Sequence, residues 1–113
     1  MEFLFVKPPQ FPNFVKKYLA EQALKDTPFN EKIWKDMQTD LFILESKLDK
    51  ITAPTLIVWG DSDRVIHISS VPIFEKGIKN SKSLIIKECG HVPMTEKPQE
   101  TASIYQDFLN GKN

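Results

Sequence analysis

Two short segments of the sequence place titratable side chains directly after a glycine. One is Gly60–Val65 (GDSDRV), and the other is Cys89–Met94 (CGHVPM). A carboxylate that hydrogen-bonds an imidazole fixes the tautomer of the ring and stabilises its protonated form, so that the other ring nitrogen can take a proton from a nucleophile. Together, the two segments therefore contain the parts of an acid–base pair.

Each segment follows an apolar run that predicts a β-strand. Thr55–Trp59 is rich in β-branched residues and does not alternate with polar ones, which is typical of a parallel strand buried on both faces. Ser83–Lys87 is the second predicted strand, and Ser69–Lys79 between them predicts a short helix. Because sites in parallel sheets form beyond the carboxyl ends of the strands, we expect a carboxylate of the first segment to reach the imidazole of the second.

Further helices are predicted on both sides of this region. Asn13 is expected to cap a helix through about Lys25, and a second helix is expected to begin at Asn30. The apolar face of the second helix comprises Ile33, Met37, Leu41 and Leu44. Pro98 opens a last helix, and the proline-punctuated residues 1–12 form an extended lead-in.

Composition excludes several classes of protein. Fifteen basic residues balance fifteen acidic ones in the 113-residue chain, so we expect no nucleic-acid partner. The single cysteine, Cys89, allows no internal disulfide and is interpreted as buried. The residues given contain no apolar run near the ~20 that span a membrane and no signal peptide, and the compartment is not indicated.

The two strand-and-turn segments resemble two motifs of the α/β-hydrolases. Pro54–Val65 resembles the acid-strand motif P-x-L-x-x-x-G-x-x-D, and Gly90–Pro98 resembles the histidine motif G-H-x-x-x-x-E-x-P. The resemblance covers roughly residues 48–110, while residues 3–47 resemble more loosely the cap of monoacylglycerol-lipase-type hydrolases. It implies a partial α/β-hydrolase fold of the α/β class: a helical cap (1–47), then a region of two parallel strands alternating with helices (48–113).

The resemblance also implies roles for individual residues. Asp63 would be the triad acid, favoured over Asp61 by the Gly-x-x-Asp spacing, and His91 would be the general base. Glu96 and Pro98 would hold the histidine loop and start the last helix. His67 is interpreted as a surface or pocket-lining residue. The spacing of the aspartates and histidines matches no metal site, and we expect neither a metal nor a cofactor.

The nucleophile of the family is missing from the sequence. It lies in G-x-S-x-G, and the four glycines of this chain, at 60, 77, 90 and 111, allow no such elbow. We therefore expect part of a serine hydrolase for carboxylic esters, lipid-like ones given the cap, that is inactive alone and pairs with a missing N-terminal part. Relatives with an aspartate nucleophile (dehalogenases, epoxide hydrolases) or a cysteine one share these motifs, so the reaction type stays open.

Two other interpretations stay open. The chain is alternatively a non-catalytic binding or self-association module, in which the unpaired edge of the strand at 55–59 recruits a partner. The other interpretation is that the chain is only a remnant of a larger protein.

Aromatic and basic residues interleaved near the start fit either ordinary cap packing or a patch that makes peripheral contact with a lipid surface. They are Phe3, Phe5, Lys7, Phe11, Phe14, Lys16 and Lys17.

Overall fold

The structure is a computed structural model that describes residues 3–40 and 44–112. It divides into two compact units. The core unit holds the lead-in up to Pro8 together with the chain from Lys47 onward, and the helical unit is Pro9–Ser46.

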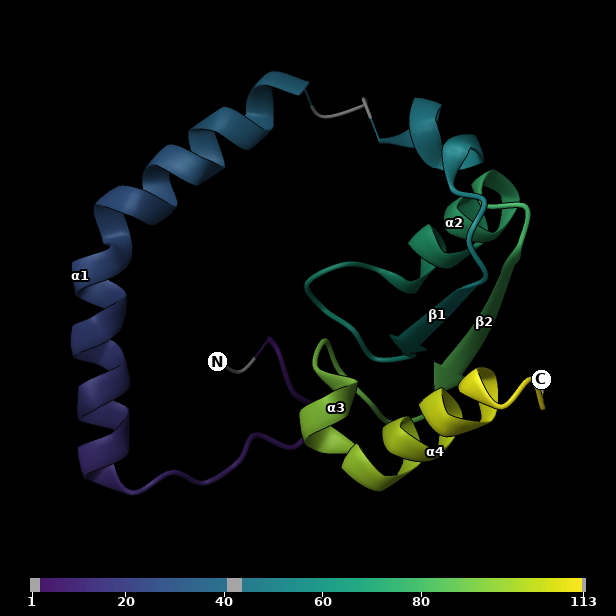
Figure 1. Cartoon of the computed structure of the whole chain (residues 1–113). Helices are drawn as coiled ribbons and strands as arrows, with labels where there is room; N and C mark the ends of the chain where they lie inside the picture. The colour runs from purple at the N-terminus through teal and green to yellow at the C-terminus, as the bar shows by residue number, and fades with distance from the viewer. Residues whose placement is uncertain (1–2, 41–43, 113) are drawn as a thin grey trace. The chain divides into compact units, whose positions relative to one another are not determined.

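A pair of parallel strands forms the centre of the core unit (Figure 1). Strand β1 (Thr55–Gly60) pairs with β2 (Ser81–Ile86) in a register that runs from Thr55 opposite Ser81 to Gly60 opposite Ile86. The predicted parallel pair is confirmed. The second strand begins two residues before the predicted Ser83, because the backbone N–H of Thr55 already donates to the carbonyl of Asn80 at 2.9 Å and sets the register there.

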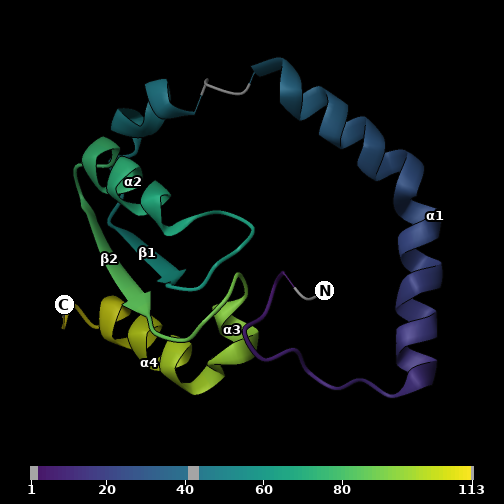
Figure 2. The same ribbon diagram turned by 180° about the vertical axis from the view of Figure 1, so that it is seen from behind.

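Helices alternate with the strands, as the α/β prediction requires. A 3₁₀ turn (Ile68–Ser70) and α2 (Val71–Gly77) lie between the strands, and α3 (Pro93–Glu96) and α4 (Pro98–Leu109) follow β2. Both ribbon views show α2 and α4 on different sides of the strand pair (Figures 1 and 2). The chain enters the core unit through a 3₁₀ stretch, Glu45–Lys50.

The buried core lies along the strands and the segments that follow them. Its least exposed apolar side chains are Leu48, Ile57, Val71, Ile78, Ile86 and Cys89. Helix α2 is shorter than the predicted 69–79, and at its end Gly77 lies against the Leu48 side chain. The four-residue α3 was not predicted, because one turn is too short for an apolar periodicity to show.

The helical unit contains one long helix where two were predicted. Helix α1 runs 25 residues, Asn13–Met37, and is followed by a 3₁₀ turn (Gln38–Asp40). The predicted break is wrong: Pro28 lies inside the helix. A proline there removes one backbone hydrogen bond and commonly bends a helix without ending it, and both views show α1 bending midway (Figures 1 and 2). Of the predicted second-helix face, Leu41 lies outside the described residues.

Helix α1 buries none of its described residues within the structure. Its most exposed large apolar side chains are Phe14, Tyr18, Leu24, Phe29, Trp34 and Met37. Asn13 is the first helical residue rather than the predicted cap, and Pro12 before it makes no capping hydrogen bond. No helical stretch in the described part of the chain combines the length and apolar character needed to span a bilayer.

Candidate active site

Backbone hydrogen bonds hold the loop after β1 against the segment after β2. The N–H of Asp61 donates to the carbonyl of Ile86 at 3.0 Å, and the N–H of Ser62 donates to the carbonyl of Cys89 at 3.0 Å. These bonds extend the contact between the parallel strands past their carboxyl ends. The two glycine-led segments therefore lie side by side, as their position after neighbouring strands predicts.

Asp63 and His91 form a hydrogen-bonded pair where these segments meet. The Nδ1 atom of His91 lies 2.9 Å from Oδ2 of Asp63. The Asp63 side chain is 4% exposed, whereas that of His91 is 32% exposed. The other carboxylate oxygen of Asp63 accepts hydrogen bonds from the backbone N–H groups of Val65 (2.8 Å) and Ile66 (3.0 Å). The predicted carboxylate–imidazole contact is confirmed.

The surroundings of Asp63 keep its carboxyl group ionised. Burial raises the pKa of Asp63, but the hydrogen bonds from His91, Ile66 and Val65, together with the charge of His91, outweigh it, and the pKa lies below its ordinary value. An ionised carboxylate can only accept, so the His91 Nδ1 atom carries the proton. The Nε2 atom is then the ring nitrogen that can exchange a proton with another group.

A small hollow adjoins the pair. Its volume is about 100 Å³, and it is lined by Val58, Trp59, Gly60, Asp63, His91 and Pro93. The Trp59 indole N–H donates to the carbonyl of Ile66 at 3.2 Å, which holds the far end of the acid loop near the strand. The Trp59 ring also lies 6.1 Å, centroid to centroid, from that of Phe74 on α2. The hollow is large enough for only a small part of a substrate.

Asp61 and His67 take no part in the hydrogen bond between Asp63 and His91. An Asp61 carboxylate oxygen accepts from the Ser62 hydroxyl (2.8 Å) and from the N–H of Cys89 (3.4 Å), so Asp61 links the two loops. The Ser62 hydrogen bond is the main cause that lowers the pKa of Asp61. The His67 ring accepts from the N–H of Ser69 at 3.2 Å and caps the 3₁₀ turn that follows.

Glu96 holds the histidine loop, as the motif resemblance implied. One carboxylate oxygen of Glu96 accepts from the N–H of Gly90 at 2.7 Å. The other accepts from the N–H of Val6 in the lead-in, and the N–H of His91 donates to the carbonyl of Leu4 at 2.8 Å. The lead-in was not predicted to be part of the site. Because the contacts of the lead-in use backbone groups, its side chains give no sequence pattern that would predict them.

Cys89 lies next to the site but is closed off from solvent. Its side chain is fully buried, with 0% of the residue exposed, and burial, followed by the nearby charge of Glu96, raises its pKa to about 11. A thiol in this state is protonated and a poor nucleophile. The interpretation of Cys89 as a buried side chain is confirmed.

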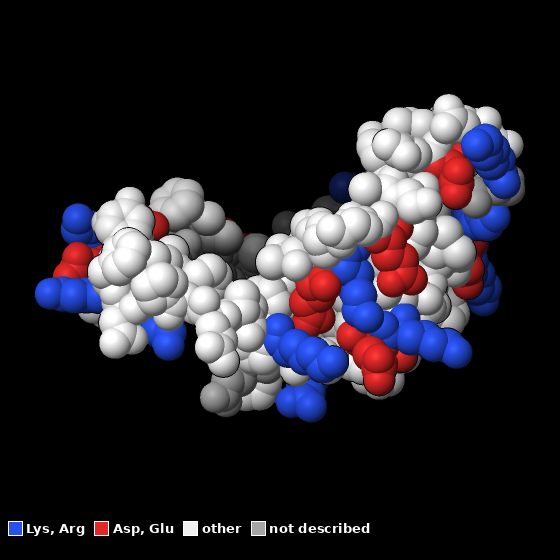
Figure 3. Space-filling model, turned by 90° about the horizontal axis from the view of Figure 1, so that it is seen from below, with Lys and Arg blue, Asp and Glu red and all other residues white. Residues whose placement is uncertain are grey.

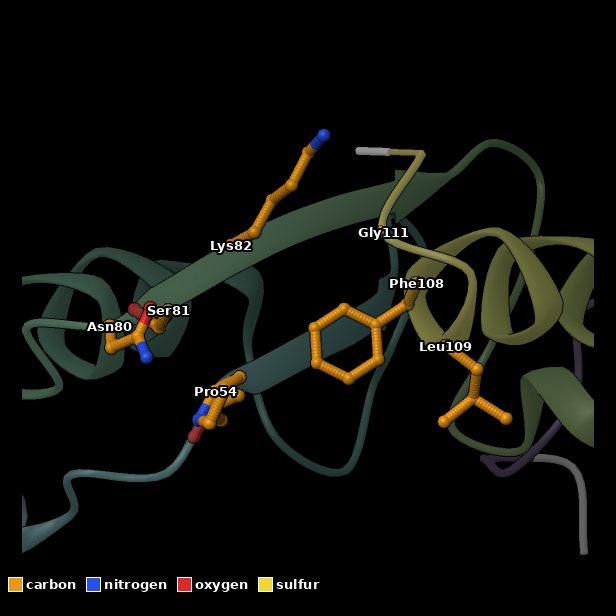
Figure 4. A pocket seen from close by; sticks show the side chains of 8 residues that line it. Pro54, Asn80, Ser81, Lys82, Phe108, Leu109 and Gly111 are labelled. Carbon is orange, nitrogen blue, oxygen red and sulfur yellow. The ribbon is translucent and has the colours of Figure 1, made fainter.

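A second, larger hollow lies at the opposite ends of the strands. It has a volume of about 550 Å³ and is lined by residues 54–55, 80–82 and 108–109 together with Gly111. The Phe108 ring extends from α4 over it, and the Lys82 amine points away (Figure 4). Lys82 is the one titratable side chain in this lining, so the hollow offers no acid–base pair.

Charge is distributed without a dominant sign. On the described residues of the face in Figure 3, acidic and basic side chains are interleaved. In the part of the chain that the structure describes, no group of three or more His, Cys, Asp or Glu side chains could hold a metal ion.

Comparisons with known proteins give the same assignment as the motifs. A model of the alpha/beta hydrolase fold matches residues 6–98. Lipase 1 of Psychrobacter immobilis is 34% identical over 108 residues, which cover 95% of this chain and 34% of that protein. Monoacylglycerol lipase ABHD6 of Mus musculus is 31% identical over 100 residues, which cover 87% of this chain and 30% of the relative.

Similarity extends to solved structures. The crystal structure of a membrane phospholipase A, a bacterial virulence factor, is matched with a TM-score of 0.90 at 44% identity, over 97% of this chain and 36% of that one. The chain thus spans about a third of the length of the curated relatives it matches, at 34% and 30%. The parallel strands of the chain alternate with helices, a buried aspartate bonds to a histidine, and a family model matches most of the length. The chain therefore belongs to the α/β-hydrolase fold family and is related to its lipases.

Proposed function

We propose that Asp63 and His91 are the acid and the general base of a catalytic triad that hydrolyses carboxylic esters. The observation that carries the proposal is the 2.9 Å contact between Oδ2 of Asp63 and Nδ1 of His91. The carboxylate is buried and ionised, while the ring is partly exposed and borders a hollow. This arrangement leaves Nε2 of His91 as the atom that can accept a proton.

The proposed reaction has two halves. The Nε2 atom of His91 takes a proton from a nucleophilic hydroxyl as its oxygen attacks the ester carbonyl carbon, and then gives the proton to the departing alcohol. In the second half it takes a proton from water, whose oxygen attacks the acyl carbon, and gives that proton to the nucleophile oxygen as its bond to the acyl group breaks and the acid is released. Asp63 holds the ring in the Nδ1–H tautomer throughout and stabilises the imidazolium.

The nucleophile is proposed to come from a segment outside these 113 residues. The sequence contains no G-x-S-x-G elbow. Loss of a triad nucleophile costs on the order of 10⁶ in turnover, a magnitude known from subtilisin, so we expect this chain alone to be inactive. The same Asp–His pair also serves hydrolases with an aspartate nucleophile. A fluorophosphonate probe that labels a serine of the whole protein would support the serine mechanism over that one.

The proposed substrates are lipid-like esters. Two relatives are named as lipases, and α1 of the helical unit exposes large aromatic side chains, including Phe14, Phe29 and Trp34. We propose that residues 1–47 form the cap of the enzyme and that this helix contacts a lipid surface peripherally. Reduced sedimentation with phosphatidylcholine vesicles in a Phe14→Ser/Phe29→Ser variant would support this contact, and unchanged sedimentation would oppose it.

A second candidate function is self-association or pairing with another segment through β1. In the described residues β1 pairs with β2 on one side alone, which leaves the other edge of the strand available for backbone hydrogen bonds. Light scattering of the purified chain tests this idea. A dimer or larger assembly at low concentration supports it, and a compact monomer opposes it.

The experiment for the main proposal compares two variants with two controls in the whole protein. Asp63→Asn and His91→Ala should each lower kcat/KM for p-nitrophenyl butyrate by about 10³-fold or more without changing the circular dichroism spectrum. Asp61→Asn and His67→Ala should retain most of the activity, because neither residue bonds to the pair. Full activity in His91→Ala would overturn the proposal, and His91-dependent turnover by the 113-residue chain alone would overturn its predicted inactivity.

A further inference from the structure

We propose that Glu96 and the lead-in residues Leu4–Val6 form a histidine clamp that positions His91. In this clamp, the orientation of the general base depends on the stretch of chain that leads into the helical unit. The inference rests on the proposed function of His91 and adds to it a set of positioning residues. The clamp consists of the backbone of Leu4 and Val6, the backbone of Gly90 and the carboxylate of Glu96.

Three hydrogen bonds define the histidine clamp. The carboxylate of Glu96 accepts from the N–H of Gly90 at 2.7 Å with one oxygen and from the N–H of Val6 with the other. The N–H of His91 itself donates to the carbonyl of Leu4 at 2.8 Å. Two of these bonds have an ionised acceptor, and such bonds are about twice as strong as neutral ones.

The clamp holds the backbone of His91 from both sides. Glu96 ends α3, and its own N–H donates to the carbonyl of Val92 at 3.1 Å, so the loop from Gly90 to Glu96 closes on itself. The lead-in closes the other side through Leu4. Asp63 fixes only the Nδ1 end of the ring, so the backbone position is what determines where the Nε2 end points. General-base catalysis is sensitive to displacements of about 1 Å.

Gly90 has a specific function in this contact. A Cβ atom at Gly90 would lie 2.6 Å from the carbonyl oxygen of Leu4 and 3.1 Å from the Cα of Phe5. The backbone of Gly90 has no positive φ angle, so the glycine is not needed for a left-handed turn. It is needed because the lead-in lies directly against the histidine loop.

The lead-in connects this contact to the helical unit. Val6 is three residues before Pro9, where that unit begins, and Pro8, Pro9 and Pro12 stiffen the connection. The clamp therefore includes a stiff segment that leads directly into the helical unit.

Two matched pairs of variants test the clamp. Glu96→Gln leaves one oxygen acceptor where two are needed, and Glu100→Gln makes the same change at an exposed position of α4 for which the structure shows no hydrogen bond. Val6→Pro removes the donor to Glu96, and Lys7→Pro inserts a proline one position later, where the N–H makes no hydrogen bond of the clamp. Amide exchange at Gly90 and His91 and the ring ¹⁵N signals of His91 are measured by NMR.

We expect Glu96→Gln and Val6→Pro to speed exchange of the Gly90 or His91 amide by about tenfold to hundredfold. Both variants should also shift the His91 ring signals toward a mixture of tautomers, which a merely stabilising role would not do. Glu100→Gln and Lys7→Pro should leave both readouts unchanged. Unchanged ring signals in both clamp variants would overturn the inference, as would equal effects in the two controls.

Activity separates this inference from the proposed function. In the whole protein, Glu96→Gln should lower kcat by about tenfold or more while KM changes little, because both Glu96 oxygens bond to backbone N–H groups and Glu96 does not line the hollow beside His91. If His91→Ala retains full activity, the proposed function fails, yet the NMR readouts still decide whether the clamp positions the ring. If His91→Ala is inactive and Glu96→Gln alters neither kcat nor the ring signals, the clamp alone is wrong.

Discussion

The backbones of Gly60 and Gly90 are in direct contact. A Cβ atom at Gly60 would lie 2.3 Å from the carbonyl oxygen of Gly90 and 2.2 Å from that of Cys89. Gly60 ends β1 and has no positive φ angle, so its small size, rather than its conformational freedom, is what the fold uses. The close approach of the two chains is what brings the acid loop within hydrogen-bonding distance of the histidine loop.

Gly60→Ala should therefore destabilise the core unit and separate Asp63 from His91. A methyl group at this position meets backbone atoms that cannot rotate away, and we expect a loss of about 3 kcal/mol or more in the free energy of unfolding. Urea denaturation measures the loss. Gly111→Ala is the control, since Gly111 has a φ of +64° but no atom within 4 Å of the added Cβ. Its expected cost is about 1–2 kcal/mol, and a larger cost there than at Gly60 would contradict this explanation.

Cys89 should resist modification in the folded chain. Its side chain is fully buried and its pKa is raised to about 11, so at pH 8 only about 0.1% of the thiol is ionised, before its inaccessibility is considered. We expect iodoacetamide to react at least about 100-fold more slowly with the native chain than with the chain in urea. Comparable rates in the two conditions would show that the segment after β2 opens readily.

Stability should fall in acid partly because Asp63 becomes protonated. The pKa of Asp63 is lower in the folded chain than its ordinary value of 3.8, so the unfolded chain binds more protons in this range. The stabilising contribution is fully present above pH 3.8 and is lost as the pH falls through the folded pKa. Below pH 3.8, the free energy of unfolding of Asp63→Asn should fall less steeply with decreasing pH than that of the parent chain. The two slopes should differ by an amount that corresponds to up to about one proton.

Urea titrations between pH 7 and pH 2 measure this difference. Asp61→Asn should change the slope in the same direction, because hydrogen bonds also lower the pKa of Asp61. Identical pH profiles for the parent chain and Asp63→Asn would mean that the hydrogen bonds of Asp63 do not lower its pKa in solution.

Local patterns and sheet geometry were enough to predict that a carboxylate of the first segment meets the imidazole of the second. The run at 55–59 and the run at 83–87 each read as a buried strand, and parallel strands end at the same edge of a sheet. Asp63 and His91 could therefore be placed together although they are 28 positions apart. The Gly-x-x-Asp spacing of the acid-strand motif then selected Asp63 over Asp61.

Other features depend on contacts that no local pattern shows. The lead-in bonds to Glu96 and His91 through its backbone, so neither Leu4 nor Val6 has a side chain that signals the contact. Gly90 did carry a signal, because glycine is expected where backbones approach closely, but its partner could not be named. The break expected between Lys25 and Asn30 is wrong because α1 continues through Pro28, which bends the helix without ending it (Figure 1).

The same proline gives the last prediction, Pro28→Ala. Proline has no N–H to donate to the Leu24 carbonyl, and in a helix interior it costs about 3 kcal/mol relative to alanine. At this position the Thr27 hydroxyl donates to the Ala23 carbonyl at 3.0 Å, so part of the disrupted turn is bonded by a side chain. We expect Pro28→Ala to increase the circular dichroism signal at 222 nm and to slow amide exchange in the second half of α1, while Thr27→Val, which removes that side-chain bond, accelerates exchange slightly. Faster exchange in Pro28→Ala would mean that the bend is required for the packing of the helix in solution, and the proline would then be a structural feature of the proposed cap rather than a tolerated defect.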